Sequence, residues 1–233
     1  MDIPVIILAG GFGTRLRSVV SAIPKPMAPI KGRPFLEYQL SHLEEQGVRE
    51  VVLAVGYKAD IIETYFGAQW QSMHIKYSHE EAPLGTGGAL IQACQLIPQI
   101  SPVFVLNGDS YYPANFDNMH RSHSERNAAV SIAVFKTAES QRYSSFDLGN
   151  DGSLLRPTDR LSPYKSAGLY LFSSDIVSEF RRLPVVNTSF EKELMNSLWC
   201  NGERVFAYYE DCVFIDIGVP EDYRRASDII SDF

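Results

Sequence analysis

Short, mostly apolar runs alternate along the chain with stretches whose apolar residues recur at helical spacing. The apolar runs lie at residues 3–8, 50–55, 103–106 and 129–135. Such runs are typical of strands that are buried on both faces of a parallel sheet. The stretch 34–43 has the helical spacing, and Gly47 marks the end of its helix. The alternation predicts a doubly wound α/β fold with right-handed crossovers.

The remaining apolar pattern continues this alternation. Helices are expected at 60–66, 86–97, 114–126, 173–182, 190–199 and 220–230, and strands at 75–77, 205–209 and 213–215. Residues 137–172 contain glycines and prolines that predict short strands and turns. We therefore expect one domain over residues 1–233, a Rossmann-like three-layer α/β sandwich with a mostly parallel mixed sheet. A small β-rich insertion would line a substrate pocket.

Composition and charge narrow the class of protein. The chain has 233 residues and a formal net charge of −7. We expect no nucleic-acid partner, because duplex binding depends on lysines and arginines that neutralise phosphates. The three cysteines have spacings that match neither a disulfide framework nor a zinc site, which favours a reducing, cytoplasmic location.

Other features of the chain argue against membranes and a histidine metal site. No signal peptide or membrane-spanning run is evident, so we expect no membrane association. His120 and His123 lie on a predicted helix without a further ligand nearby, and they are interpreted as solvated surface residues. The sequence leaves the oligomeric state open, a homo-oligomer included.

A glycine-rich loop follows the first predicted strand at once. Residues 8–16 read Leu-Ala-Gly-Gly-Phe-Gly-Thr-Arg-Leu, and residues 24–26 read Pro-Lys-Pro. Three glycines in four positions can turn backbone N–H groups toward one point, where they can cradle phosphate oxygens. Arg15 and Lys25 add two cations within reach of the loop. The stretch therefore predicts a triphosphate site that is built from backbone.

Well-known phosphate-binding loops do not account for this stretch. A Walker loop needs Gly-x-x-x-x-Gly-Lys-Ser/Thr, which the chain lacks. The dinucleotide-binding fingerprint Gly-x-Gly-x-x-Gly begins at Gly11-Phe12-Gly13, but it requires a glycine at position 16, where this chain has leucine. A protein kinase would need His-Arg-Asp and Asp-Phe-Gly downstream, and neither occurs. An ordinary glycine-rich turn is the alternative, but the neighbouring Arg15 and Lys25 favour phosphate binding.

Two aspartates come directly after predicted strands. Asp109 ends the run Asn107-Gly108-Asp109, and Asp216 precedes Ile217-Gly218. Ligands of open α/β sheets bind at the carboxyl ends of strands, and carboxylates there can hold Mg²⁺ against substrate phosphates. The alternatives are an Asx turn for Asp109 and a helix N-terminal charge for Asp216. As a pair beside a phosphate loop, they favour metal binding.

A second glycine cluster, Leu84-Gly85-Thr86-Gly87-Gly88, opens the helix predicted at 86–97. Glycine has no side chain, so this backbone could receive a flat ring closely. The alternative is simple capping of the helix by Thr86. Glu80 and Glu81 lie just upstream, either as surface charges or as acceptors for the edge of a base.

Taken together, these motifs resemble those of sugar-1-phosphate nucleotidyltransferases. The resemblance spans almost the whole chain in the order of the family, and it rests on residues 10–16, 24–26, 84–89, 107–109, 167–170 and 216–222. It implies an in-line displacement that depends on a metal ion. An oxygen of the sugar phosphate attacks the α-phosphorus of a nucleoside triphosphate, and pyrophosphate leaves.

The resemblance also implies roles for particular residues. Arg15 and Lys25 would be the catalytic cations, and Asp109 and Asp216 would bind Mg²⁺. The nucleotide would be bound by Leu8, Ala9, Gly10, Gly11, Gly13, Thr14, Glu80, Gly85, Thr86 and Gly108. The sugar would be bound by Asp159, Arg160, Ser166 and Gly168.

The runs 24–30 and 214–223 are similar to those of the guanylyltransferases that act on D-glycero-D-manno-heptose 1-phosphate. This implies GTP and that heptose phosphate as substrates. In the expected sugar pocket, however, Asp159-Arg160 replaces the usual Glu-Lys and Ser166 replaces asparagine. Alternatives are a uridylyl- or thymidylyltransferase on a hexose 1-phosphate, and a catalytically inactive regulatory subunit that binds nucleotide sugars.

Glu80 is the candidate for reading the base, because it lies where the family's base-reading side chain tends to fall before Gly85. Guanine presents N1–H and N2–H₂ as adjacent donors, and one carboxylate can accept both. Uracil and thymine would place a carbonyl oxygen against the carboxylate. We therefore hypothesise that Glu80 selects guanine. The alternative is a solvated Glu80, with Glu81 or backbone groups reading the base.

Overall fold

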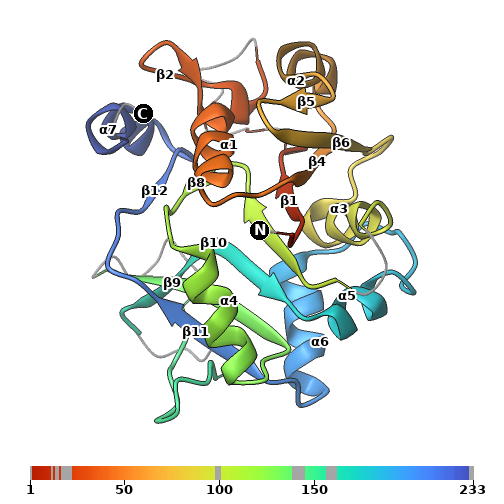
Figure 1. Cartoon of the computed structure of the whole chain (residues 1–233), viewed down its shortest axis with the longest axis vertical. Coiled ribbons are helices and arrows are strands. Elements are labelled where there is room, and N and C mark those ends of the chain that lie inside the picture. Colours follow the sequence, from red (N-terminus) through yellow and green to blue (C-terminus); the bar gives the residue numbers. More distant parts are fainter. Residues whose placement is uncertain are drawn as a thin grey trace.

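The computed structural model of the chain describes residues 2–11, 13, 16, 23–97, 101–137, 145–155 and 162–230 (Figure 1). At its centre lies an eight-stranded sheet with the strand order β11-β9-β10-β7-β1-β4-β6-β5. Its strands are β1 (Val5–Leu8), β4 (Glu50–Val55), β5 (Gln69–Trp70), β6 (Met73–His79), β7 (Val103–Asn107), β9 (Val130–Lys136), β10 (Tyr164–Phe172) and β11 (Val205–Tyr209). Two-stranded sheets are formed by β2 (Pro29–Ile30) with β3 (Arg33–Pro34) and by β8 (Ser110–Tyr111) with β12 (Ile215–Asp216).

The helices form the outer layers. They are α1 (Phe35–Glu45), α2 (Ala59–Phe66), α3 (Gly85–Cys94), α4 (Phe116–Glu125), α5 (Ser174–Phe180), α6 (Met195–Cys200) and α7 (Pro220–Ile229), with a 3₁₀ turn η1 (Lys25–Met27) and a π-helical turn η2 (Phe190–Leu194). Apolar residues of α1, α2 and α4 pack on one face of the large sheet, and those of α3, α5 and α6 pack on the other. In the described ranges, no helix is long and apolar enough to cross a membrane.

Strand β1 shows why an apolar run forms this arrangement. Val5 and Ile7 face the core under α1, whereas Ile6 faces the core under α3. All three side chains are fully buried. Because successive side chains of a strand point to opposite faces, a strand covered on both sides must be apolar at every position. The predicted three-layer α/β sandwich is thus confirmed.

The pairing of the strands makes the sheet mixed, as predicted. β1 pairs in parallel with β4 and β7, β4 with β6, and β9 with β11. β10 is antiparallel to both of its neighbours, β7 and β9. Because β10 runs in the opposite direction, β9 and β11 have the same direction as β7. The carboxyl ends of β1, β4, β7, β9 and β11 therefore lie at one edge of the sheet.

The β-rich insertion is smaller than the range 137–172 that the sequence pattern predicted. Its last part forms β10, a buried strand of the central sheet. In the described residues 145–155, the pairing consists of isolated bridges such as Leu148 with Leu154. Gly168 has φ +74° and lies where the pairing of β10 with β9 shifts register. The glycines and prolines earlier in the range, Gly149, Gly152, Pro157 and Pro163, were interpreted as turn signals, and the core strand that follows them was included in the same range.

Helix α4 corrects the interpretation of one histidine. His123 is 6% exposed, and its Nδ1 lies 2.9 Å from the Ser131 hydroxyl of β9. It therefore belongs to the interface between helix and sheet, and the prediction of a solvated residue was wrong for it. The buried environment lowers the pKa of His123 to about 4, chiefly because burial disfavours the charged ring.

The small sheet of β8 and β12 brings two distant strand ends together. Asp216 pairs opposite Ser110 in this sheet, so it lies beside the residue that follows Asp109. A separate apolar cluster, which includes Tyr38, Tyr111 and Ile215, packs this sheet against α7 and the first turn of α1. The position of Asp216 is thus set by packing that is independent of the two large cores.

Candidate active site

A cavity of about 680 Å³ opens at the carboxyl ends of β1, β4, β6 and β7. Most residues that were predicted to bind the nucleotide line it together with two of the predicted catalytic and metal-binding residues: Leu8, Ala9, Gly10, Gly11, Gly13, Lys25, Glu80, Gly85, Thr86, Gly108 and Asp109. This is the edge at which open α/β sheets bind ligands. The motifs that lie far apart in the sequence therefore share one cavity.

The glycines around β1 are required by close contacts with other segments. A Cβ atom at Gly108 would lie 2.7 Å from the carbonyl oxygen of Leu8, and one at Gly10 would overlap Glu80 Oε1. Gly13 has φ +57°, and a Cβ there would lie 3.0 Å from Cβ of Lys25. Gly11 differs, because a Cβ atom there would meet no atom of the described residues within 4 Å. Its backbone is the part of the loop that is open to a ligand.

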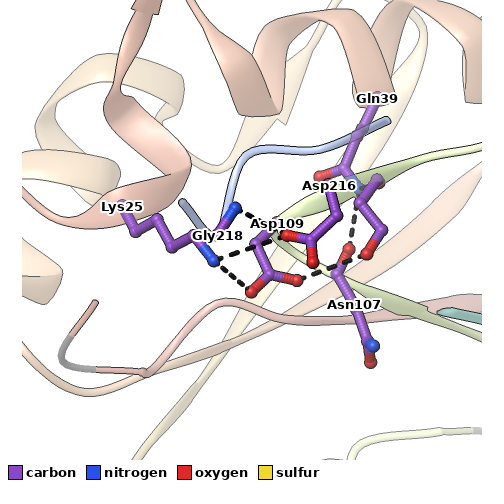
Figure 2. Close-up of polar contacts among 7 residues, drawn as sticks. Lys25, Gln39, Asn107, Asp109, Asp216 and Gly218 are labelled. Carbon is purple, nitrogen blue, oxygen red and sulfur yellow. Dashed lines mark hydrogen bonds and ion pairs between the residues drawn. The ribbon is translucent and has the colours of Figure 1, made fainter. Parts of the chain in front are cut away.

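Lys25, Asp109 and Asp216 converge at one end of the cavity (Figure 2). Lys25 Nζ lies 2.5 Å from Asp109 Oδ2 and 3.8 Å from Asp216 Oδ1. Asp216 Oδ1 also accepts a hydrogen bond from the Gly218 N–H at 2.6 Å. The lysine side chain is only 9% exposed. The prolines on either side of Lys25 restrict the backbone of η1 that carries it.

The two aspartates meet the requirements of a magnesium site. Both carboxylates face a single cationic group, the Lys25 ammonium, so their oxygens already surround a position that suits positive charge. Mg²⁺ is usually held by one or two carboxylates together with water and substrate phosphates. The described residues form no group of three or more His, Cys, Asp or Glu that could hold a metal without such help. The residues present therefore fit a metal that arrives with the nucleotide.

The alternative role of Asp216 as a helix N-terminal charge does not fit the structure, because the acidic residues in the first turn of α7 are Glu221 and Asp222. Helix α7 begins at Pro220 with Val219 as its N-cap, and no side chain caps it. Asp216 lines a second cavity of about 360 Å³ beside the first, together with Phe214 of the same segment. It therefore faces the space next to Lys25, at the boundary between the two cavities.

Glu80 lies in the cavity, half-buried, directly after β6. Its Oε2 accepts a hydrogen bond from the Leu84 N–H at 3.0 Å, and its Oε1 lies over Gly10. Burial raises the pKa of Glu80, and the Leu84 N–H opposes this effect. One carboxylate oxygen thus fixes the loop before α3, and the other, Oε1, lies against Gly10.

The second glycine cluster has a structural role that the sequence did not reveal. Thr188 O accepts a hydrogen bond from Gly87 N at 2.8 Å, and Thr188 N donates to Leu84 O at 2.9 Å. A Cβ at Gly85 would lie 2.6 Å from Thr188 O, and Cβ atoms at Gly87 and Gly88 would overlap the same segment. Because these glycines have no side chains, residues 186–190 can pack directly against the start of α3.

Thr86 does not cap helix α3, so that alternative was wrong. The N-cap position is Leu84, without a side-chain hydrogen bond. The Thr86 hydroxyl oxygen instead accepts a hydrogen bond from the Phe190 N–H at 3.0 Å. Thr86 therefore holds η2 at the wall of the cavity.

The remaining predicted residues lie either outside the described part of the chain or away from the cavity lining. Thr14, Arg15, Asp159 and Arg160 lie outside the described residues. The Ser166 hydroxyl is 2.9 Å from the Tyr170 hydroxyl and accepts from the Gly168 N–H at 3.2 Å, so it spans the bulge of β10. A Cβ at Gly168 would lie 3.0 Å from the Asn107 side-chain nitrogen. Gly168 thus lies close to the segment that carries Asp109, without lining the cavity.

Other residues of the cavity wall were not predicted. Gly56 and Tyr57 come just after the carboxyl end of β4, so the rule that ligands bind at the carboxyl ends of strands could have found them. Phe190 and Glu191 reach the cavity because η2 packs on α3, and no local motif marks them. π-Helical turns occur frequently at functional sites, but this one is visible only in three dimensions.

Comparisons with known proteins agree with this geometry. The model of the nucleotidyl transferase family matches residues 4–232. The chain is 35% identical to D-glycero-alpha-D-manno-heptose 1-phosphate guanylyltransferase from Aneurinibacillus thermoaerophilus over 236 residues, which cover 95% of each protein. The enzyme of the same name from Campylobacter jejuni is 35% identical over 221 residues, covering 94% of this chain and 96% of that protein.

A solved structure is similar over the same extent. The crystal structure of HddC from Yersinia pseudotuberculosis complexed with GMP-PN has a TM-score of 0.83 to this chain at 33% identity. The similarity covers 97% of this chain and 98% of that one. Sequence, fold and site therefore agree, and the chain belongs to the nucleotidyl transferase family.

Proposed function

We propose that this protein transfers GMP from GTP to a sugar 1-phosphate, D-glycero-D-manno-heptose 1-phosphate, and releases pyrophosphate and a GDP-sugar. The observation that carries the proposal is the convergence of Lys25, Asp109 and Asp216 beside a cavity lined by glycines. Guanylyltransferases of the heptose phosphate among the relatives support the choice of both substrates. The three cysteines form no disulfide, which supports a cytoplasmic location.

The proposed reaction is a single displacement. A phosphate oxygen of the sugar 1-phosphate forms a bond to the α-phosphorus of GTP. The bond between this phosphorus and the oxygen that bridges to the β-phosphate breaks, and pyrophosphate leaves with that oxygen. No side chain has to form a covalent bond with either substrate. Catalysis would come from orientation and from stabilisation of charge on the phosphates.

The residues of the cavity can supply both contributions, orientation of the substrates and stabilisation of charge on the phosphates. Backbone N–H groups of the loop at Gly10, Gly11 and Gly13 can hold the triphosphate. Lys25 presents its ammonium group where the phosphates meet Asp109. Mg²⁺ held by Asp109 and Asp216 would neutralise phosphate charge during the transfer. Asp216 lies at the boundary of the two cavities, so the acceptor phosphate can approach from the side of the second cavity.

Glu80 supports guanine as the base. Glu80 lines the cavity with its Oε1 against Gly10, and a carboxylate can accept from the adjacent N1–H and N2–H₂ donors of guanine. Its position is held by the hydrogen bond from Leu84, so the acceptor is oriented before the nucleotide binds. The same carboxylate would face carbonyl oxygens on uracil or thymine.

The test is pyrophosphate release over a grid of substrates. Purified protein is combined with GTP, ATP, UTP or dTTP and with the 1-phosphates of D-glycero-D-manno-heptose, mannose or glucose, with and without Mg²⁺. We expect the highest kcat/KM for GTP with the heptose phosphate, and turnover only with the metal. The Asp109→Asn protein, purified in the same way, controls for contaminating activity. Turnover with UTP or dTTP and a hexose phosphate would favour the alternative enzyme, and no turnover in any well would favour a regulatory subunit.

A further inference from the structure

Gln39 is a buried glutamine of α1 whose amide group contacts the turn of residues 107–110, which carries Asp109 (Figure 2). Its Nε2 donates hydrogen bonds to the carbonyl oxygens of Asn107 at 2.9 Å and of Ser110 at 2.7 Å. The residue is 2% exposed. Asn107 ends β7 and Ser110 begins β8, so one amide joins the two residues that flank Gly108 and Asp109.

The chemistry of this contact favours glutamine in particular. The side-chain amide has two N–H donors, and both are used on backbone carbonyls of the same turn. Its other atom, Oε1, is buried without a hydrogen-bond partner in the described part of the chain. Buried polar atoms normally have partners, so a glutamine with an unsatisfied oxygen is retained for its donors and not for its packing. A glutamate at position 39 would place a negative charge beside the carbonyl oxygens of Asn107 and Ser110.

The turn held by Gln39 determines the position of both aspartates. Asp109 lies between the two bonded carbonyls, and its own carbonyl oxygen accepts a hydrogen bond from Ile217 N at 2.9 Å. Ser110 pairs with Asp216 across the β8–β12 sheet. A shift of the turn would therefore move Asp109 directly and Asp216 through the pairing. The two carboxylates would then no longer face a common point.

We propose that Gln39 is a positioning residue for the nucleotidyl transfer, which holds the turn of Asp109 in the geometry that binds the metal ion. It touches neither substrate in this role, and it acts through the backbone of Asn107 and Ser110. The inference rests on the proposed function, because it assumes that the two aspartates bind a divalent cation. Groups that orient metal ligands typically change metal affinity or activity by about 10–100-fold when they are removed.

The test compares Gln39→Met with Tyr38→Phe. Methionine has similar length and no donor, so it removes both hydrogen bonds. Tyr38 is the neighbouring residue of α1, is equally buried, and donates a hydrogen bond to the Ile30 carbonyl at 2.9 Å. Phenylalanine removes the hydroxyl and keeps the ring that packs against Tyr111 and Ile215 in the cluster beside the β8–β12 sheet. The Tyr38→Phe protein therefore controls for the loss of a buried hydrogen bond made by the same helix. Gln39→Asn, which keeps the amide on a shorter side chain, is prepared in parallel in case methionine prevents folding.

Two measurements are made on folded protein below its melting temperature. Binding of Mn²⁺ in the presence of GTP, without acceptor, is followed by the free Mn²⁺ signal in electron paramagnetic resonance. Steady-state kinetics gives kcat and the KM for GTP. We expect Gln39→Met to weaken Mn²⁺ binding and lower kcat by about 10–100-fold, with little change in KM. Gln39→Asn should show the same effects, and Tyr38→Phe should bind Mn²⁺ like the wild type.

Either of two results would overturn the inference. One is wild-type Mn²⁺ binding and kcat in the folded Gln39 variants. The other is an equal loss in Tyr38→Phe, which would mean that the effect is one of stability. Failure of the proposed function gives a different result, since the wild-type protein itself would then show no turnover. Metal binding is measured without turnover, so the role of Gln39 can be judged even if the acceptor sugar is a different one.

Discussion

Lys25 Nζ lies 2.5 Å from Asp109 Oδ2, an ion pair between residues 84 positions apart in the sequence. It connects the loop after β1 with the turn after β7, two neighbouring strands of the sheet. The lysine side chain is nearly buried, so its charge is compensated by the carboxylate before any ligand arrives. Under the proposed function, Lys25 would exchange the carboxylate for phosphate oxygens when the metal ion and the nucleotide bind.

Replacement of Lys25 by alanine is expected to lower kcat by about 10²–10³-fold, with little change in the KM for GTP. The backbone of the glycine loop still holds the triphosphate, whereas the lost ammonium acts on charge that develops in the transition state. Steady-state kinetics measures both constants. Lys76→Ala, which removes an exposed lysine paired with Glu50 on the sheet edge, is the control. An increase in KM with unchanged kcat would show that Lys25 serves binding only.

Asp109→Asn and Asp216→Asn are each expected to abolish most turnover while the fold is retained. Each removes one of the negative charges that would hold Mg²⁺, so the Mg²⁺ concentration for half-maximal rate should increase by at least about tenfold. The rate is measured as a function of Mg²⁺, with circular dichroism as the check on folding. Asp117→Asn, on the exposed side of α4, should behave like the wild type. Near-normal rates of both variants at limiting Mg²⁺ would contradict the metal assignment.

The sequence predicted the fold well where the signal was local. The apolar runs of β1, β4, β7 and β9 identified the buried strands, because a strand between two helical layers buries side chains on both faces and is therefore mostly apolar. β10 was missed because it follows a run of glycines and prolines that favours turns, and it was assigned to the same insertion. Only its pairing with β7 and β9 shows that it lies in the centre of the sheet.

In the site, too, the residues that a local motif marks could be predicted, and those that only tertiary packing brings together could not. Gly10, Gly11 and Lys25 are close in sequence, so a motif could reveal them. Gln39 and Phe190 reach the site only through the packing of α1 and η2, and a lone glutamine or phenylalanine in a helix carries no signal of its own. The glycines of the second cluster were recognised as special, but the group that approaches them most closely is the backbone of Thr188.

Glu80→Gln is expected to lose GTP turnover steeply and to narrow the difference between GTP and UTP. The amide offers one donor and one acceptor, so it no longer matches the two adjacent donors of guanine. The ratio of kcat/KM for GTP and UTP is measured for both proteins. Glu81→Gln is measured alongside, since Glu81 also lines the cavity. An unchanged ratio in Glu80→Gln would disprove its role, and a changed ratio in Glu81→Gln alone would transfer that role to Glu81.

His123 is expected to make the protein less stable in acid. Its pKa is lowered from 6.5 to about 4 by burial, so between these values the unfolded chain binds a proton that the folded protein does not. The free energy of unfolding should therefore fall as the pH decreases from 6.5 to about 4, by up to roughly 3 kcal/mol. Urea titrations over this range should show a smaller decrease in His123→Gln. His74→Gln, at an exposed position of β6, should keep the wild-type decrease; parallel curves for all three proteins would refute the role of His123.

The two glycine clusters should respond differently to alanine. A Cβ at Gly88 would overlap Val186 O and lie 2.9 Å from the Leu84 side chain, so Gly88→Ala must displace backbone that packs on α3. It should lower the free energy of unfolding by about 1–3 kcal/mol, as overpacked sites do. A Cβ at Gly11 would project into the cavity, where no atom of the described residues lies within 4 Å.

Gly11→Ala should therefore keep wild-type stability and weaken nucleotide binding, because its methyl group occupies space above the backbone that receives the phosphates. Urea titration and GTP binding by calorimetry, performed on both variants, separate the two effects. Gly67→Ala is not a suitable control, because Gly67 has φ +62° and alanine would be strained there. Gly88→Ala and Gly11→Ala therefore serve as controls for each other, one for stability and one for nucleotide binding. If Gly11→Ala binds GTP as tightly as the wild type, the loop after β1 is a structural turn, and the phosphates of the nucleotide lie elsewhere in the cavity.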